Sequence, residues 1–153
     1  MSELLNVMIV PFQQQRAVVL PREVVGYVLP YAPPLPSSYS QAALVGSLIY
    51  QSEKVPVLDM SVLFNQQPTA LSEIDGKRRI VIVSCLYKHP DFNSYALLAS
   101  EAPRMIQLQE SDVHDIDSEV PDLFYSHIDL AKDKTDHMLY VPDLKALETT
   151  LFD

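Results

Sequence analysis

The stretch from Leu44 to Phe64 reads Leu-Val-Gly-Ser-Leu-Ile-Tyr-Gln-Ser-Glu-Lys-Val-Pro-Val-Leu-Asp-Met-Ser-Val-Leu-Phe. Residues 44–50 and 55–58 are mainly apolar and rich in strand formers, and the polar residues 51–54 between them have the length of a tight connection. This pattern predicts a β-hairpin. Because Pro56 has no backbone N–H, its strand must lie at a sheet edge or have a free backbone position there.

Asp59 directly follows the hairpin, where a short helix is expected to begin. Its carboxylate can accept hydrogen bonds from the N–H groups of the first helical turn, and Val62, Leu63 and Phe64 would supply the buried side. We therefore expect Pro56 and Asp59 to be structural residues of the hairpin-to-helix junction. The segment holds no group arranged for bond-breaking chemistry, which favours a scaffold that presents a surface.

Apolar segments on both sides of this hairpin predict further strands. Residues 6–12 and 16–20 flank three glutamines and predict a first hairpin. Residues 79–86, Arg-Ile-Val-Ile-Val-Ser-Cys-Leu, are apolar at consecutive positions and predict the longest and most central strand. The core residues of that strand would be Ile80, Ile82, Val83 and Cys85. Further strands are expected at residues 95–99 and 105–108, as a kinked or paired edge, and at 124–130 and 137–141, as a last hairpin.

The remaining segments predict loops and one more helix. Residues 30–36 hold four of the twelve prolines and predict a stiff loop, with a ligand for aromatic grooves as the lesser alternative. Residues 65–77 and the acidic residues 110–119 predict solvated loops, and the pattern after Asp143 predicts a terminal amphipathic helix. The 153-residue chain is thus predicted to be one all-β domain with short helices, most simply built as two small barrels.

Composition excludes several classes of protein. A single cysteine excludes an internal disulfide, and the missing charged-then-apolar leader predicts a reducing, cytoplasmic setting. Every apolar run is far shorter than the roughly 18 residues of a membrane span, so any link to a membrane would be indirect. Residues 110–153 hold twelve acidic and three basic residues. The net charge of this segment, −9, equals the net charge of the whole chain. Such a surface repels nucleic acid and suits a basic protein surface.

Residue types that act as metal ligands or catalytic groups in other proteins are scattered along this chain. His89, His114, His127 and His137 lack metal-ligand spacing, and Cys85 lies in the most apolar run, where a core role is expected. Gly46-Ser47 lacks the second glycine of a nucleophile elbow, and three glycines in all leave no phosphate-binding loop. We therefore expect no enzyme activity, cofactor or metal. Lys77-Arg78-Arg79 predicts a solvated strand entry, with a docking contact as the alternative.

The order and spacing of these segments resemble the CheW family, the small adaptors of bacterial chemosensory arrays. That family carries a Gly-Val-hydrophobic strand, an Arg-Gly turn, a Val-Pro-hydrophobic-Asp-Leu strand and a short helix. The matching positions are Val45-Gly46, Ile49, Val55-Pro56-Val57-Leu58-Asp59-Met60 and Leu63-Phe64. The resemblance implies one CheW-like domain over residues 1–153, built from two five-stranded β-barrel subdomains around a shared core. Subdomain 1 would span about residues 12–77 and subdomain 2 about 78–140, with the terminal segments crossing over.

The resemblance also implies a function. The protein would be a non-catalytic adaptor in bacterial signal transduction, without a cofactor, that couples chemoreceptor tips to the regulatory domain of a CheA-type histidine kinase. Other CheW-like domains are further expected partners. The family's partner-binding groove lies between the barrels. The corresponding positions here are Val24, Gly26, Tyr27, Gly46, Gln51 and Ser52, with residues near 99–105.

Several of these positions depart from the family pattern. The glutamate of a Val-x-Glu sequence is replaced by Gly26, the Arg-Gly turn by Gln51-Ser52, and a Val-Asp-x-Val sequence by residues 99–102. These changes remove charge-assisted contacts. We therefore expect an accessory adaptor that binds receptor tips weakly or not at all, most similar to members of type IV pilus (twitching) systems. A small-barrel interaction module with an unrelated partner, and an enzyme with a site formed only on folding, are the alternatives.

Overall fold

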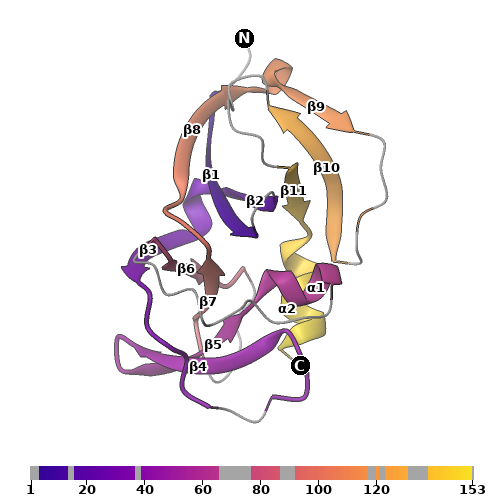
Figure 1. Cartoon of the computed structure of the whole chain (residues 1–153). Helices are drawn as coiled ribbons and strands as arrows, with labels where there is room; N and C mark the ends of the chain where they lie inside the picture. Colours follow the sequence, from indigo (N-terminus) through magenta and orange to yellow (C-terminus); the bar gives the residue numbers. More distant parts are fainter. Residues whose placement is uncertain are drawn as a thin grey trace.

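Strands make up most of the regular structure. The computed structural model describes residues 4–13, 16–36, 39–65, 77–86, 92–116, 120, 123–130 and 138–152. The strands are β1 (Leu4–Gln13), β2 (Arg16–Pro21), β3 (Val25–Pro30), β4 (Leu44–Tyr50), β5 (Glu53–Leu58), β6 (Arg79–Ser84), β7 (Ser94–Ala99), β8 (Arg104–Gln109), β9 (Val113–Ile116), β10 (Phe124–Leu130) and β11 (Met138–Pro142). The helices are the 3-10 turns η1 (Arg22–Val24) and η2 (Glu110–Asp112) and the α-helices α1 (Met60–Asn65) and α2 (Leu144–Leu151). The predicted all-β fold with short helices is confirmed (Figure 1).

The first sheet has six strands in the order β8-β1-β2-β11-β10-β9. β1 and β2 pair antiparallel, as do β10 and β11, which confirms the first and last predicted hairpins, while β2 and β11 pair in parallel. The two outer strands, β8 and β9, are joined by the three residues of η2. Because so short a link connects opposite edges, the sheet must curl into a barrel.

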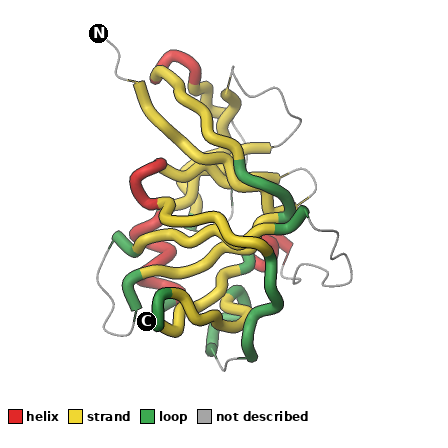
Figure 2. The backbone as a smooth tube through the Cα atoms, turned by 90° about the vertical axis from the view of Figure 1, so that its left-hand side faces the viewer, coloured by secondary structure: helices red, strands yellow, loops and turns green. Residues whose placement is uncertain are grey.

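The second sheet has five strands in the order β3-β6-β7-β5-β4. Its outer strands, β3 and β4, also approach each other, because the rings of Tyr27 and Tyr50 lie with centroids 6.1 Å apart. The segment after β3 adds a second link: Leu35 and Ser47 exchange two backbone hydrogen bonds of 2.7 and 2.9 Å. This sheet therefore closes into the second barrel. Figure 2, from the side, shows the two groups of strands stacked one above the other.

Side-chain alternation along the inner strands creates three apolar cores. On β6, Ile80 and Ile82 point into the five-stranded barrel, and Val81 and Val83 point into a larger core between the barrels. β1 and β2 alternate in the same way between that shared core and the interior of the six-stranded barrel. Because successive side chains of a strand point to opposite faces, such strands must be apolar throughout. Two barrels around a shared core, as predicted, are thereby confirmed, but one sheet has six strands where five were expected.

The C-terminal helix covers the shared core. Leu144, Leu147 and Leu151 of α2 are buried in it. Asp143 is the N-cap residue, since its Oδ1 accepts a hydrogen bond of 3.0 Å from the backbone N–H of Ala146. The predicted terminal amphipathic helix is confirmed.

Three segment predictions were wrong in part. β6 ends at Ser84, so Cys85 lies after the strand and is half-buried, and the longest strand is β1. Residues 95–99 and 105–108 do not form an edge pair, because the chain crosses between the barrels after β7 and β8 joins β1. The acidic residues 110–116 are not a loop, since they form η2 and the outer strand β9.

The sheets divide the chain differently from the expected subdomains. The five-stranded sheet takes β3 to β7, and the six-stranded sheet combines β1 and β2 with β8 to β11. The boundary expected at residues 77–78 therefore falls within the five-stranded sheet, and the chain changes sheets near residues 21–25 and 99–104. Residues 66–76 of the predicted loop, as well as His89 and His137, lie outside the described residues.

Candidate docking surface

The hairpin of β4 and β5 is built by local sequence. Gln51 and Ser52 form its turn with φ values of 50° and 67°, and both residues are exposed. Positive φ at both central residues matches the twist of a two-residue hairpin turn, which confirms the predicted hairpin. Pro56 is buried, and β5 is an inner strand whose pairing with β7 involves only Val57 and Leu58. Two alternatives were stated for Pro56: a strand at a sheet edge, or a backbone position that needs no N–H donor. The structure has the second, because Pro56 is not paired with β7.

Asp59 lies at the junction of the hairpin and α1. The carboxylate is buried, and its Oδ1 accepts a hydrogen bond of 3.0 Å from the backbone N–H of Ser61, which is the contact expected of a helix N-cap. The backbone N–H of Asp59 donates to the carbonyl of Ala43 at 2.8 Å, and the Ser61 hydroxyl donates to the Phe12 carbonyl at 3.2 Å. The first of these bonds joins the two ends of the hairpin, and the second ties α1 to β1 of the other barrel.

Val24 and Gly46, two of the expected partner-binding positions, are buried. A Cβ atom at Gly46 would lie 2.5 Å from the carbonyl oxygen of Leu35 and 2.8 Å from the Cβ of Pro34. Gly46 therefore lets the proline-rich segment cross β4 in close contact, so that segment is packed as the predicted loop. These two residues can affect a partner only through the backbone that they position.

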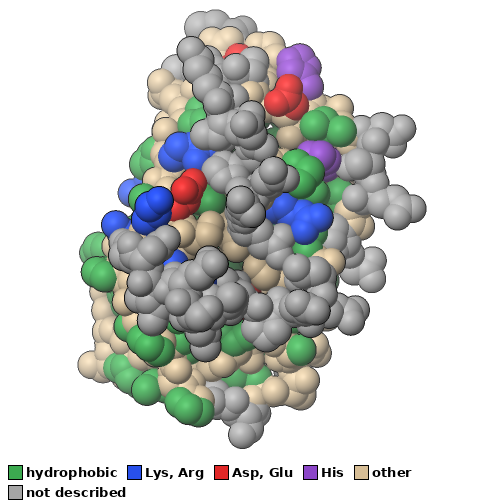
Figure 3. All heavy atoms as spheres, viewed as in Figure 1, with side chains coloured by type: hydrophobic (Ala, Val, Ile, Leu, Met, Phe, Trp, Pro, Cys, Tyr) green, Lys and Arg blue, Asp and Glu red, His purple; other side chains and the backbone are tan. Residues whose placement is uncertain are grey.

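The exposed expected positions lie beside large apolar side chains. Tyr27 of β3 is 58% exposed, and Leu35 and Ile49 beside the closure of the barrel are 51% and 61% exposed. We call Tyr27, Val28, Leu35 and Ile49 the apolar patch. Figure 3 shows hydrophobic side chains gathered on this part of the molecule, over β3 and β4. Leu35 and Ile49 were not identified as partner residues from the sequence. Leu35 lies in the predicted proline-rich loop, and Ile49 lies in a strand-forming segment, where an apolar residue is expected to be buried.

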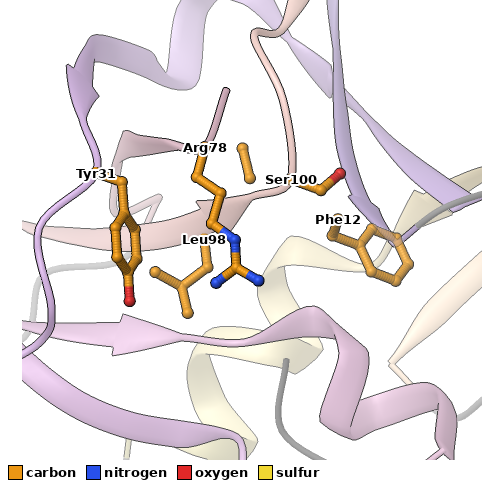
Figure 4. Close-up of a pocket in the computed structure, with 6 residues that line it drawn as sticks. Phe12, Tyr31, Arg78, Leu98 and Ser100 are labelled. Atoms are coloured by element: carbon orange, nitrogen blue, oxygen red, sulfur yellow. The ribbon is translucent and has the colours of Figure 1, made fainter. Parts of the chain in front are cut away.

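A small hollow lies where the two barrels meet (Figure 4). The residues that line it come from distant parts of the chain: Phe12, Tyr31, Arg78, Leu98, Ala99 and Ser100. The backbone N–H of Ser100 donates to the carbonyl of Pro11 at 2.8 Å, which fixes the crossing from β7 to β8 against β1. Residues 99–100 of the expected region 99–105 thus lie at the barrel junction. Tyr31 was not predicted to belong to a site, and Arg78 was noted only as part of a basic cluster.

The surroundings of Cys85 and His127 bear on whether either group could carry chemistry. Burial, with smaller contributions from Glu148 and Glu53, raises the pKa of the Cys85 thiol to about 12. A thiol of that pKa is protonated at neutral pH and is a poor nucleophile. His127 stacks on Tyr140 with ring centroids 4.8 Å apart, and nowhere among the described residues do three His, Cys, Asp or Glu side chains gather as metal ligands would.

Comparison with known proteins identifies the family of this two-barrel fold. The family model for the CheW-like domain matches residues 6–150. The chain belongs to the CheW-like domain family. Among solved structures, this CheW-like domain is similar to the scaffolding protein TtCheW from Thermoanaerobacter tengcongensis, with a TM-score of 0.69 and 14% sequence identity over 96% of this chain and 88% of that one. At this identity the likeness concerns the fold.

Two further findings complete the comparison. No curated protein matches the chain significantly. In the described ranges, neither α-helix of the CheW-like domain has the length and apolar character that crossing a membrane requires.

Proposed function

We propose that this CheW-like domain is a non-catalytic scaffold of bacterial chemosensory signalling that acts in the cytoplasm. It docks the regulatory domain of a CheA-type histidine kinase, or another CheW-like domain, through the surface of its five-stranded barrel. The apolar patch is the observation that carries the proposal, because it places four large apolar side chains in solvent at one barrel closure. Exposed apolar side chains that lie together are typical of protein–protein contact sites.

The patch has the properties of an anchor for a protein partner. The Tyr27 ring rests on Tyr50, which limits its motion before binding and so lowers the entropy cost of docking. Tyrosines in such positions commonly contribute much of the binding free energy. Burial of the patch removes apolar surface from water without requiring any charged group to be desolvated.

The same surface supports weak binding to receptor tips. Gly26 and the Gln51-Ser52 turn present no charged side chain, so the charge-assisted contacts of the family pattern are missing here. This loss, next to an intact fold, favours an accessory adaptor over a standard coupling protein. We place it in a type IV pilus system, where deletion of its gene should impair twitching.

Calorimetric titration against a CheA-type regulatory domain tests the proposal. Tyr27→Ala and Ile49→Asp should weaken binding by at least about tenfold, which corresponds to roughly 1.4 kcal/mol. Tyr125→Ala is the matched control, because Tyr125 is 69% exposed on β10 of the other barrel. Wild-type protein that binds neither a kinase domain nor any CheW-like domain would contradict the proposal and leave an interaction module with an unrelated partner.

A further inference from the structure

We propose that residues 31–36 of the proline-rich segment, Tyr-Ala-Pro-Pro-Leu-Pro, are a preformed ligand for an uncharged, aromatic-lined groove on a partner protein. Three of these six residues are prolines, whose rings fix φ near about −65°. Ala32, Pro33 and Leu35 each precede a proline, which restricts them to extended conformations. The covalent structure of this segment therefore confines it to the polyproline II region.

The burial of this segment repeats every three residues. Its exposure runs half-buried, exposed, exposed, and then repeats in the same order. A polyproline II helix has three residues per turn, so residues three apart share an edge. Tyr31 and Pro34 form the half-buried edge, which lies on the barrel. The other residues form two edges that face solvent, namely Ala32 with Leu35 and Pro33 with Pro36.

The five-stranded barrel holds the half-buried edge in place. Tyr31 packs against the apolar interior of that barrel, and Pro34 lies against Gly46, where an added Cβ would be 2.8 Å from the proline Cβ. Leu35 exchanges backbone hydrogen bonds of 2.7 and 2.9 Å with Ser47 of β4. Figure 1 shows the chain after β3 running across β4. Because the segment is ordered before a partner arrives, it loses little conformational entropy on docking.

The exposed edges present the surface that an aromatic groove recognises. Ala32-Pro33 and Leu35-Pro36 are two apolar–proline pairs one helical turn apart, which is roughly 9 Å along the axis. Proline-rich segments of this spacing dock their exposed edges between the aromatic rings of a groove. Leu35 is 51% exposed, so its side chain is available for such a contact.

The absence of charge narrows the kind of groove. Residues 24–52 contain no Asp, Glu, Lys, Arg or His, so the segment and the strands around it offer no counter-ion. A charged groove would be desolvated here without compensation, which favours aromatic and neutral polar side chains on the partner. The contact should therefore respond little to salt. This ligand role goes beyond the proposed function, and the two surfaces share only Leu35.

Isolated domains that bind proline-rich segments can test the inference on the folded full chain. We would titrate the isotopically labelled protein with an SH3 domain, a WW domain and an EVH1 domain, three classes with aromatic-lined grooves. At least one of them should shift the amide signals of Ala32 and Leu35 with saturation. Its affinity should change by less than about twofold between about 50 and about 200 mM salt.

Substitutions identify the edges that bind. Pro33→Ala and Pro36→Ala should each weaken binding of that domain by at least about fivefold, because each loses an exposed ring and loosens the extended backbone. Pro21→Ala is the matched control, since Pro21 is an exposed proline at the end of β2, and it should change the affinity by less than about twofold. If a proline variant does not fold, Leu35→Ser decides, because it changes only an exposed side chain and should cause a similar loss.

Three outcomes would overturn the inference. The first is the absence of saturable shifts with all three domains. The second is an equal affinity of wild type and Pro36→Ala, or of wild type and Leu35→Ser where the proline variants do not fold. The third is an affinity that falls steeply with salt, which would indicate a charged contact elsewhere. Failure of the kinase titration leaves these results unchanged, so the two proposals fail separately.

Discussion

The carboxylate of Glu148 accepts a hydrogen bond of 3.0 Å from the backbone N–H of Leu86, across 62 residues of chain. Glu148 is buried on α2, and Leu86 follows the end of β6. The bond therefore holds the C-terminal helix to the five-stranded barrel next to Cys85, just after the end of β6. A carboxylate acceptor generally forms a stronger hydrogen bond than a neutral acceptor does.

We expect Glu148→Ala to lower the free energy of unfolding by roughly 1.5–3 kcal/mol, because a partly buried N–H loses a charged acceptor. Glu148→Gln keeps an acceptor oxygen and should cost less. Urea denaturation measures both, with Lys145→Ala, an exposed residue of the same helix, as the control. Equal stability of Glu148→Ala and wild type would show that the bond does not hold the helix.

Replacement of Asp59 by alanine removes the cap of α1. We expect a loss of about 0.5–2 kcal/mol in thermal or chemical unfolding, the usual range for an N-cap. Asp59→Asn retains an oxygen for the Ser61 N–H and should be milder. A melting curve of Asp59→Ala that matches wild type would contradict the role assigned to this carboxylate.

The two glycines of the five-stranded barrel should respond differently to alanine. Gly46→Ala would place a methyl group 2.5 Å from the Leu35 carbonyl oxygen, so the proline-rich segment must shift, at a cost of about 1–3 kcal/mol. Gly26→Ala meets its nearest atom, the Ile82 carbonyl oxygen, at 3.4 Å and should be tolerated. Differential scanning calorimetry of both variants would decide, and equal melting temperatures would refute the packing argument.

The thiol of Cys85 should react slowly in the native state. With its pKa at about 12, the thiolate fraction at pH 8 is smaller than that of a free thiol by about three orders of magnitude. Alkylation by iodoacetamide should therefore be far slower than in urea. Reaction at the rate of the unfolded chain would mean that the thiol is not shielded.

The same shift predicts a pH dependence of stability. The native pKa of the thiol is raised from an ordinary value of 9.0, so the native state holds the proton more tightly than the unfolded state. The resulting stabilisation is complete below pH 9 and is lost as the pH rises towards 12. Cys85→Ala should flatten this alkaline loss in unfolding curves.

Restoring the charged groups of the family pattern should increase receptor binding. The double variant Gly26→Glu with Gln51→Arg is sterically reasonable, since Gly26 has room for a Cβ and Gln51 already has a side chain at φ 50°. Each charge-assisted bond can contribute about 1.5–3 kcal/mol, offset in part by side-chain ordering. Calorimetry against a receptor-tip fragment tests this, and tight binding by wild type would show that the lost groups do not matter.

Local features of this fold could be predicted from the sequence. The hairpin was indicated by the polar connection between two apolar segments, and the cap at Asp59 by a residue type that favours helix starts. Both depend on contacts within a few residues. Consecutive apolar residues likewise identified β6 as a central strand. Successive side chains of a strand point to opposite faces of the sheet, so a run of consecutive apolar residues indicates that both faces are buried.

The features that were missed depend on distant contacts. Strand β9 contains His114 and Asp115 and reads as a polar loop, and it is defined as a strand only by its pairing with β10. The hollow brings together Phe12, Tyr31 and Arg78, which no spacing rule connects. The sheet to which β6 and β7 belong similarly depends on their pairing with β3 and β5, which are distant in sequence.

The parallel pairing of β2 with β11 sets an order for folding. Residues 25–99 contain the five-stranded barrel as a continuous stretch, whereas the six-stranded barrel needs both β1–β2 and the strands after residue 103. On a ribosome, the five-stranded barrel can therefore assemble while the N-terminal hairpin still lacks its neighbour β11. Pairing over such a separation is intrinsically slow. During that interval the apolar faces of β1 and β2 stay open to other chains, which makes this hairpin the point where a nascent chain is most exposed to aggregation.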